Sequence, residues 1–285
     1  MTPPVVWMLL GEDLRRLRVG RGLTQVQAAL HLGCHLSKIS RIEQGQHRVT
    51  QRDVEVLLDH YRASPRDRAE ADILLTAPDL EDGHYWDGSP LAGLRMAALT
   101  ADATTVQAWN ACYFPGPLQT PAYARALLDA GPLDLDPDQA DQVADTRRSK
   151  RHPGQRLTVY LAESVLHRPW GGHRVMAEQL EHLRATGRSR RVTVRVIPAS
   201  RAFVASDLTV LTMPASRPDL MCQDQMSHAG YYTAPQQLHR AQLVMAGASD
   251  AALDESTSAR LIRDACARYG DFPRPRSTSG RRNFS

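Results

Sequence analysis

Apolar residues between positions 11 and 77 recur every three or four residues, which is the spacing of amphipathic helices. Leu14, Leu17 and Val19 form the first of these stripes. Residues that favour helix ends separate the stripes: Gly22, Gly33 and Gly45 follow a stripe, and Thr24, Thr50, Ser64 and Pro65 precede one. The pattern therefore predicts five short helices around a common core, the last of which ends near Pro78.

Residues 24–43, with the sequence TQVQAALHLGCHLSKISRIE, predict two short helices joined by a tight turn. Thr24 is a good N-cap for the first helix, and Gly33 ends it because glycine adopts left-handed backbone at little cost. The small side chains of Ala28 and Ala29 allow the two helices to approach closely. The second helix then presents polar and basic side chains outward, as in a helix-turn-helix unit whose second helix enters the DNA major groove.

Beyond position 78 the chain changes character and then alternates between helical and strand patterns. Residues 79–100 are acidic, turn-rich and aromatic, which predicts a linker or docking segment. Residues 101–130 return to a helical pattern, although the prolines of FPGPLQTPAY exclude a continuous helix. Further helices are expected at 137–152, 175–187, about 235–247 and 255–269, and strands at 157–164, 192–198, 207–214 and 218–225.

Strands that alternate with helices indicate a mixed α/β domain around a small sheet. We therefore predict an α+β protein with an all-α, five-helix helix-turn-helix domain at residues 1–78. The linker or docking segment covers 79–100, and a larger mixed α/β domain that binds a partner or a ligand covers 101–270. Residues 271–285 contain Pro, Ser, Arg and Gly and little to bury, so a disordered basic tail is expected.

The composition narrows the class of protein. Its 285 residues suffice for two domains, and the net charge of +4 is compatible with a polyanionic partner but too small to identify one. Four widely spaced cysteines without a CxxC pair fit neither a zinc finger nor a disulfide framework, so we expect reduced thiols and a cytoplasmic protein. No apolar run approaches the roughly 18 residues of a membrane helix, and the N-terminus lacks the features of a signal peptide.

Enzymatic chemistry has little support in the sequence. The GxxxxGKS/T phosphate loop, a GxGxxG after a strand and the GxSxG elbow are missing. Glu163 and His167 stand four residues apart, as do Glu178 and His182, but each pair offers fewer ligands than the three or four that zinc requires. We expect salt-bridged helix surfaces there, no metal, no cofactor and no enzyme; catalysis on the C-terminal domain is the least favoured alternative.

Many of the first 65 residues match a known helix-turn-helix pattern at fixed spacing. The matching residues are Leu14, Leu17, Arg18, Thr24, Gln25, Ala29, Leu32, Gly33, Ile39, Ser40, Arg41, Ile42, Glu43 and Gly45. On these residues the chain resembles the xenobiotic-response-element family, which includes phage-type repressors. His35 departs from the family, which usually caps the second helix with Ser or Thr, and Ala28 stands where a larger apolar residue is common.

This resemblance implies how the unit would contact DNA. Leu36, Ser37 and Arg41 fall at positions where the family reads bases, and an arginine there is suited to two hydrogen bonds with guanine. The residues expected at phosphates, which position a protein without reading sequence, are Gln25, Lys38, Ser40 and Arg48. The alternative is an ordinary helix pair, in which Arg41 and Glu43 form a solvated face or pair within the protein.

The string FPGPLQTPAYARALL at 114–128 resembles the PGLLQT motif of a C-terminal domain in antitoxin-like regulators of high-GC bacteria. Residues that extend the match are Glu163, Leu166, Gly171, Gly172, Val175, Met176, Gln179, Leu180, Leu183, 194–198, Ser256 and Ser258. The resemblance, from about 90 to 269, implies a small acidic partner protein that is often encoded nearby. It also implies relatives that regulate development or antibiotic production or form toxin–antitoxin-like pairs. Pro117 replaces the leucine usual in the motif.

Considered as residues alone, Pro115, Gly116 and Pro117 fix a sharp turn in which Gln119 is suited to satisfy backbone groups. The turn either positions the following helix or forms a pocket for a ligand or a partner peptide. The candidate binding residues are Pro115, Gly116, Gln119 and Tyr123.

Together these patterns predict a sequence-specific, DNA-binding transcription regulator. A homodimer on a double-stranded DNA operator is expected, because one short recognition helix reads too few base pairs for specificity. A small partner protein or a ligand would modulate its activity through the C-terminal domain. The leading alternative is an antitoxin-like interaction module that sequesters a small acidic partner, with DNA binding secondary.

Overall fold

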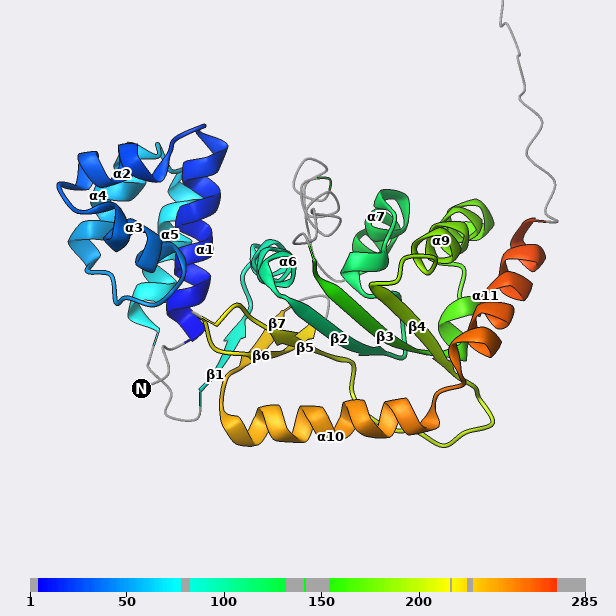
Figure 1. The fold of residues 1–285 in the computed structure, drawn as a ribbon. Coiled ribbons are helices and arrows are strands. Elements are labelled where there is room, and N and C mark those ends of the chain that lie inside the picture. The colour runs from blue at the N-terminus through cyan, green and yellow to red at the C-terminus, as the bar shows by residue number, and fades with distance from the viewer. Residues whose placement is uncertain are drawn as a thin grey trace, which may run out of the picture.

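The computed structural model describes residues 5–77, 83–131, 141, 154–215, 217–224 and 228–270. A bundle of helices at the N-terminus stands beside a sheet that carries helices on both faces (Figure 1). The predicted fold class, an all-α part followed by a mixed α/β part, is confirmed. The expected basic tail at 271–285 lies outside the described residues, as does the expected helix at 137–152 except for residue 141.

The N-terminal part contains the five predicted helices, whose ends follow from local capping. Thr24 and Gln27 form a reciprocal capping box at the start of the second helix, and Gly33, with φ 66°, ends it. Thr50 and Ser64 cap the fourth and fifth helices through their side-chain oxygens. The helices are α1 (Val5–Gly20), α2 (Gln25–Leu32), α3 (Leu36–Glu43), α4 (Gln51–His60) and α5 (Pro65–Thr76).

The first helix differs from the sequence prediction at both ends. It begins at Val5 rather than near position 11, because the apolar residues before that position, such as Val5 and Leu9, are buried in the same core. Val19 was expected to face inward, but its side chain is 58% exposed. Its position five residues after Leu14 departs from the three- and four-residue spacing that keeps side chains on one helix face.

The C-terminal part is built on one sheet of seven strands in the order β1-β7-β6-β5-β2-β3-β4. The pairs β2–β3 and β3–β4 are parallel, and every other pair is antiparallel. The strands are β1 (His84–Asp87), β2 (Thr105–Asn110), β3 (Arg156–Ala162), β4 (Val192–Ile197), β5 (Leu208–Thr212), β6 (Leu220–Asp224) and β7 (Ala229–Tyr232). The four predicted strands are confirmed as β3 to β6, whereas β1, β2 and β7 were not predicted.

Helices cover both faces of this sheet (Figure 1). Alternate residues of β2 separate the two cores: Val106 and Ala108 pack with one cluster, and Trp109 packs with α10 in the other. The helices on the Val106 face are α6 (Ala92–Asp102), η1 (Gly116–Leu118), α7 (Pro121–Ala130), η2 (Glu163–His167) and α9 (Gly172–Thr186). α10 (Pro235–Ala251) crosses the opposite face, and α11 (Glu255–Gly270) packs against α9 and β4. The predicted helices at 175–187, 235–247 and 255–269 are therefore present.

Two regions take a different structure from the one that the sequence predicts. The segment 79–100, expected to be a linker or docking segment, contains β1 and most of α6, and residues 105–110, expected to be helical, form β2. Both strands are short and are stabilised by partners far along the chain: His84 pairs in register with Tyr232, and Val106 pairs with Leu157 and Leu211. Tertiary pairing of this kind overrides a weak local pattern.

The two parts of the molecule meet through buried ion pairs at α6. The guanidinium of Arg95 contacts Asp13 of α1 at 2.6 Å, Glu70 of α5 at 3.2 Å and Asp87 of β1 at 2.9 Å. The Arg95 side chain is 1% exposed. The helix-turn-helix part is thus anchored to the sheet by the segment that was expected to be a linker or docking segment.

Candidate nucleic-acid interface

The third helix is fixed to the rest of the N-terminal part by Glu43 at its end. Arg18 of α1 donates from Nε to Glu43 Oε1 at 2.5 Å and from Nη2 to Oε2 at 2.9 Å. Gln25 at the start of α2 donates from Nε2 to the same Oε2 at 2.8 Å. Three helices are therefore tied together at one buried carboxylate, which sets the orientation of α3.

Close backbone approach completes this arrangement. A Cβ atom at Gly11 would lie 2.4 Å from the carbonyl oxygen of Ile42, so α1 and α3 touch where α1 has no side chain. Gly45 has φ 68°, and a Cβ there would lie 2.5 Å from the Cα of Met8. The chain therefore turns away from α3 directly against α1, at a position that requires glycine.

The outer surface of this region carries positive charge. Glu43 is the only acidic residue between positions 24 and 50, and its side chain is 3% exposed. Three basic residues of the same stretch, Lys38, Arg41 and Arg48, are at least partly accessible. The charge that faces solvent here suits a phosphate backbone.

The three expected base-contact residues share the exposed side of α3. Leu36 is 47% exposed, while Ile39 and Ile42 on the inner side of the same helix are buried. Ser37 and Arg41 are also exposed, and Arg41 Nε donates to the carbonyl oxygen of Ser37 at 3.2 Å. The geometry leaves these side chains available to a ligand outside the protein.

Three of the four expected phosphate contacts already have intramolecular partners. Gln25 bonds Glu43, and the ammonium of Lys38 pairs with Asp53 of α4 at 2.8 Å. Ser40 Oγ accepts a hydrogen bond from Gln44 Nε2 at 3.3 Å. Arg48 is exposed in the turn before α4. His35, the poor cap, makes no side-chain capping bond, as its chemistry predicts.

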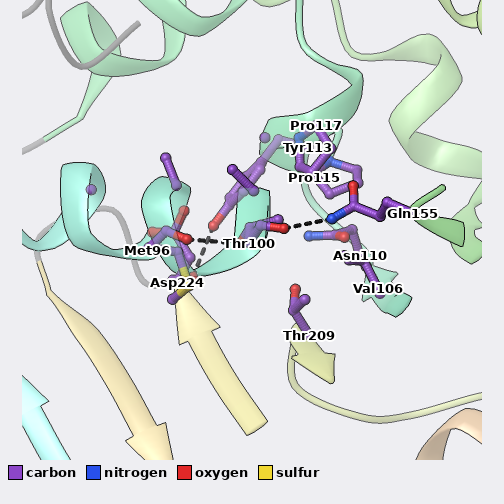
Figure 2. Close-up of a pocket in the computed structure, with 15 residues that line it drawn as sticks. Met96, Thr100, Val106, Asn110, Tyr113, Pro115, Pro117, Gln155, Thr209 and Asp224 are labelled. Atoms are coloured by element: carbon purple, nitrogen blue, oxygen red, sulfur yellow. Dashed lines mark hydrogen bonds between the residues drawn. The ribbon is translucent and has the colours of Figure 1, made fainter. Parts of the chain in front are cut away.

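The Pro-Gly-Pro turn divides the four expected ligand-binding residues into two pairs. Gln119 and Tyr123 are buried behind the turn and hold it: Gln119 Nε2 donates to the carbonyl of Phe114 at 2.6 Å, and Tyr123 Oη accepts from the Phe114 N–H at 3.4 Å. Pro115 and Gly116 instead line a cavity between the turn and α6 (Figure 2).

Comparison with known proteins assigns both parts of the chain. A helix-turn-helix domain model matches residues 9–71, and a model described as a domain of unknown function, DUF5753, matches residues 94–264, which is more than half of the chain. The chain belongs to the DUF5753 family. The match to a helix-turn-helix domain supports the conclusion that the chain is a DNA-binding regulator. The narrower resemblances, to the xenobiotic-response-element family and to the PGLLQT motif, stay predictions.

A solved structure of TrmBL2, an archaeal chromatin protein, aligns over 76% of this chain and 70% of its own, with 12% identity and a TM-score of 0.30. TrmBL2 is described as showing a novel mode of DNA binding. No curated protein matches the chain.

The DUF5753 domain contains polar residues at the cavity that sequence reasoning missed. Asn110 at the end of β2, Gln155 before β3 and Asp224 at the end of β6 all line it (Figure 2). Each lies at a strand end, but the pairing that brings the three strands together is long-range. The only local signal was a polar residue at the edge of an apolar run.

The residue pairs considered for metal binding are separate surface contacts. His167 Nε2 lies 4.0 Å from Glu163 Oε1 and 3.3 Å from Arg268 Nη2. No cluster of three or more His, Cys, Asp or Glu side chains suited to a metal ion occurs among the described residues. In the same part of the chain, no helix combines the length and apolar character needed to cross a bilayer. Cys34, Cys112, Cys222 and Cys266 are all free thiols.

Proposed function

We propose that this protein is a transcription regulator that binds an operator as a homodimer through the exposed face of α3. The observation that carries the proposal is the burial of Glu43 between Arg18 and Gln25. This contact fixes α3 and removes the only carboxylate of the region from its surface, so that the outward face offers Leu36, Ser37 and Arg41 to a polyanion.

Each of these side chains has a role that its chemistry supports. Arg41 would form two hydrogen bonds to guanine O6 and N7, and Leu36 would pack on a thymine methyl group. Ser37 is short enough to bond either kind of base edge. A bidentate arginine contact discriminates between bases by about 1–3 kcal/mol.

Phosphate contacts from Gln25, Lys38, Ser40 and Arg48 would set the register of the domain on the duplex. Lys38 would exchange Asp53 for a phosphate, so its net contribution is smaller than that of an unpaired lysine. Arg48 has the most direct access.

A homodimer follows from the size of the reading element. α3 has eight residues and therefore reaches only a few base pairs. Two copies related by a two-fold axis would read half-sites about one helical turn, or 10–10.5 base pairs, apart. The four free thiols suit a reducing compartment, which supports a cytoplasmic regulator.

The decisive experiment is capture of genomic DNA fragments by the purified full-length protein and by an Arg41→Ala variant. Enrichment of one short, two-fold-related motif that is blurred at a single position of each half-site in the variant supports the proposal. Arg174→Ala is the control, because Arg174 is exposed on α9 with 79% of its side chain accessible. Absence of enrichment at low salt overturns the proposal, and an equal loss for every sequence overturns the base-contact role of Arg41.

A second candidate function, the binding of a small acidic partner, is favoured by a groove of about 470 Å³ between α9, β4 and α11. Leu183, Val194 and Ile262 form part of its apolar floor. The basic side chains along it are Arg184, Arg188 and Arg263, against one acid, Glu255. Co-purification of a stoichiometric small acidic protein, lost in an Arg188→Glu/Arg263→Glu variant and kept in Arg174→Glu, supports this function.

A further inference from the structure

The cavity of the DUF5753 domain lies between α6 and the Pro-Gly-Pro turn, on the sheet face opposite α10 (Figures 1 and 2). Val106 and Ala108 of β2 and Thr209 of β5 form its floor, and Ala97 and Thr100 of α6 form a wall. Its volume of about 60 Å³ corresponds to roughly two water molecules at the volume per molecule of liquid water. Partly exposed residues such as Met96, Gly116 and Pro117 mark its open side.

The closed end of this cavity contains two buried acceptors without partners. Gln155 donates from Nε2 to the carbonyl oxygens of Thr100 and Ala103, both at 2.7 Å, which fixes the orientation of its amide. Its Oε1 and the Oδ1 of Asn110 have no hydrogen-bond partner in the part of the chain that the structure describes, and the two residues are 3% and 6% exposed. Buried acceptors left without a donor destabilise a fold, so a donor is expected at this place.

The remaining lining groups define the chemistry of the occupant. Asp224 adds a carboxylate, and Thr100 and Thr209 add hydroxyl groups. Among the described lining residues none is Lys, Arg or His. Acceptors and a negative charge therefore surround the space, while Met96, Val106 and Pro117 supply apolar surface toward its opening. An anion is disfavoured here, and a cation with several N–H donors is favoured.

We propose that this cavity binds a small primary amine in its ammonium form, with an apolar body toward α6 and the turn, and that α6 transmits its occupancy to the helix-turn-helix domain. α6 is the element that the cavity and the domain junction share. Met96, Ala97 and Thr100 face the cavity, whereas Arg95 and Asp102 contact α1. Gln155 holds the C-terminal end of the same helix. The transmission to DNA rests on the proposed function, but binding in the cavity does not.

The test is a titration of full-length protein, carrying ¹³C-methyl methionine, with ethylammonium chloride and with sodium acetate at matched ionic strength. Met96 lines the cavity, Met245 of α10 packs on the other sheet face, and Met8 lies in α1. Their methyl resonances are assigned through single Met→Leu variants. Ethylammonium is expected to shift the Met96 resonance saturably, to bind at least tenfold more tightly than acetate, and to leave the Met245 resonance unchanged.

Two variants locate the site without disturbing the junction. Thr209→Val removes one lining hydroxyl and is expected to weaken ethylammonium binding about fivefold, and Ala108→Val is expected to abolish it by filling the floor. Thr158→Val is the matched control, because Thr158 stands in register with Gln107 on the opposite sheet face. Equal binding of the two probes, no saturable Met96 shift, or an equal loss in Thr158→Val overturns the site.

Transmission is tested by the Met8 resonance and by operator affinity. A Met8 shift that follows the Met96 titration, with at least a threefold change in affinity for the captured motif, supports it. If the Met96 resonance shifts but neither the Met8 resonance nor the DNA affinity changes, the proposed transmission through α6 is wrong and the proposed binding site is still supported. If no DNA is captured at all, the proposed function fails, and the Met96 and Met8 titrations still decide the site and its coupling.

Discussion

Glu43 in the helix-turn-helix domain and the amides at the DUF5753 cavity show two opposite treatments of buried polar groups. Both carboxylate oxygens of Glu43 accept hydrogen bonds from neighbouring helices. Asn110 and Gln155 are buried to a similar degree, yet each leaves an oxygen without a partner among the described residues. The first arrangement holds α3 in place without a ligand, and in our proposal the second is completed by what enters the cavity. The proposed recognition surface and the proposed ligand cavity thus differ in whether the protein satisfies its own polar atoms.

The largest expected effect comes from the junction between these two regions. Arg95→Met would leave Asp13, Glu70 and Asp87 buried together without their common cation. Loss of a buried ion-pair partner costs about 3–5 kcal/mol, and we expect the free energy of unfolding to fall by an amount near the top of this range. Chemical denaturation at pH 7 measures it.

The pH dependence of this variant separates charge from packing. Burial raises the pKa of Asp13 and of Asp87 above the usual range, so both carboxyls take up protons readily as the pH falls. The loss should therefore shrink at pH 5, where repulsion between the carboxylates is relieved. If Arg95→Met loses as much stability at pH 5 as at pH 7, the loss comes from packing and not from repulsion between the carboxylates.

Removing the buried Glu43 carboxylate, which ties α1, α2 and α3 together, is expected to have the next largest effect. Glu43→Ala leaves the guanidinium of Arg18 buried without its carboxylate, which costs about 3–4 kcal/mol of stability and frees α3 to reorient. Thermal unfolding measures the stability, and DNA capture measures the surface. Glu55→Ala on the exposed side of α4 is the matched control and should change stability by less than about 0.5 kcal/mol. Equal losses of stability in the two variants would refute the role of the Glu43 carboxylate in holding the three helices together.

Gly11→Ala tests the close contact of α1 with α3. Because the added Cβ would lie 2.4 Å from the Ile42 carbonyl oxygen, the helices must separate, and a loss of about 1–3 kcal/mol is expected. Gly20→Ala in the same helix has open space around the new methyl group and serves as control, with no loss expected. Denaturant midpoints of the two variants compare them directly. If both variants lose the same stability, the contact is not responsible.

The smallest expected effect is a gain from Glu12→Gln. Burial raises the pKa of Glu12 from 4.5 to about 7, although Arg217 lies 3.0 Å away. Between these two values the folded state binds more protons than the unfolded state, so stability falls as the pH rises through the interval. This fall amounts to about 3 kcal/mol, and the variant avoids it but leaves the buried Arg217 with Asp102 as its acidic partner. A net gain of about 1 kcal/mol is therefore expected at pH 8 and none at pH 4. Denaturation across pH checks the sign, and a variant less stable at pH 8 would reverse it.

Local chemistry made the N-terminal part predictable from sequence. Caps such as Thr24 and Ser64, and the left-handed Gly33, act within a few residues of their own positions. Strands β3 to β6 were also predicted from local patterns, and buried and less buried residues alternate most clearly in β4. The burial of Glu43 was only one of two alternatives in the sequence, because its partner Arg18 lies 25 residues earlier.

The junction and the cavity could not be predicted in this way. β1 has four residues and an exposed Trp86, so its apolar pattern is weak, and its pairing partner β7 lies near the other end of the domain. Arg95 and Asn110 look like ordinary polar residues of a helix and a strand end. Their burial arises only when distant elements assemble around them.

The pairing of β1 with β7 also sets the order in which this molecule is completed during synthesis. The helix-turn-helix domain leaves the ribosome first, and domains generally fold as they emerge. β1 follows within a few residues, but its register partners Ala229–Tyr232 are among the last parts of the sheet to be made. For most of translation the nascent chain therefore carries the helix-turn-helix domain without the strand pair that seats it on the sheet. The proposed control of DNA binding by the DUF5753 domain would be the last property that the growing polypeptide acquires.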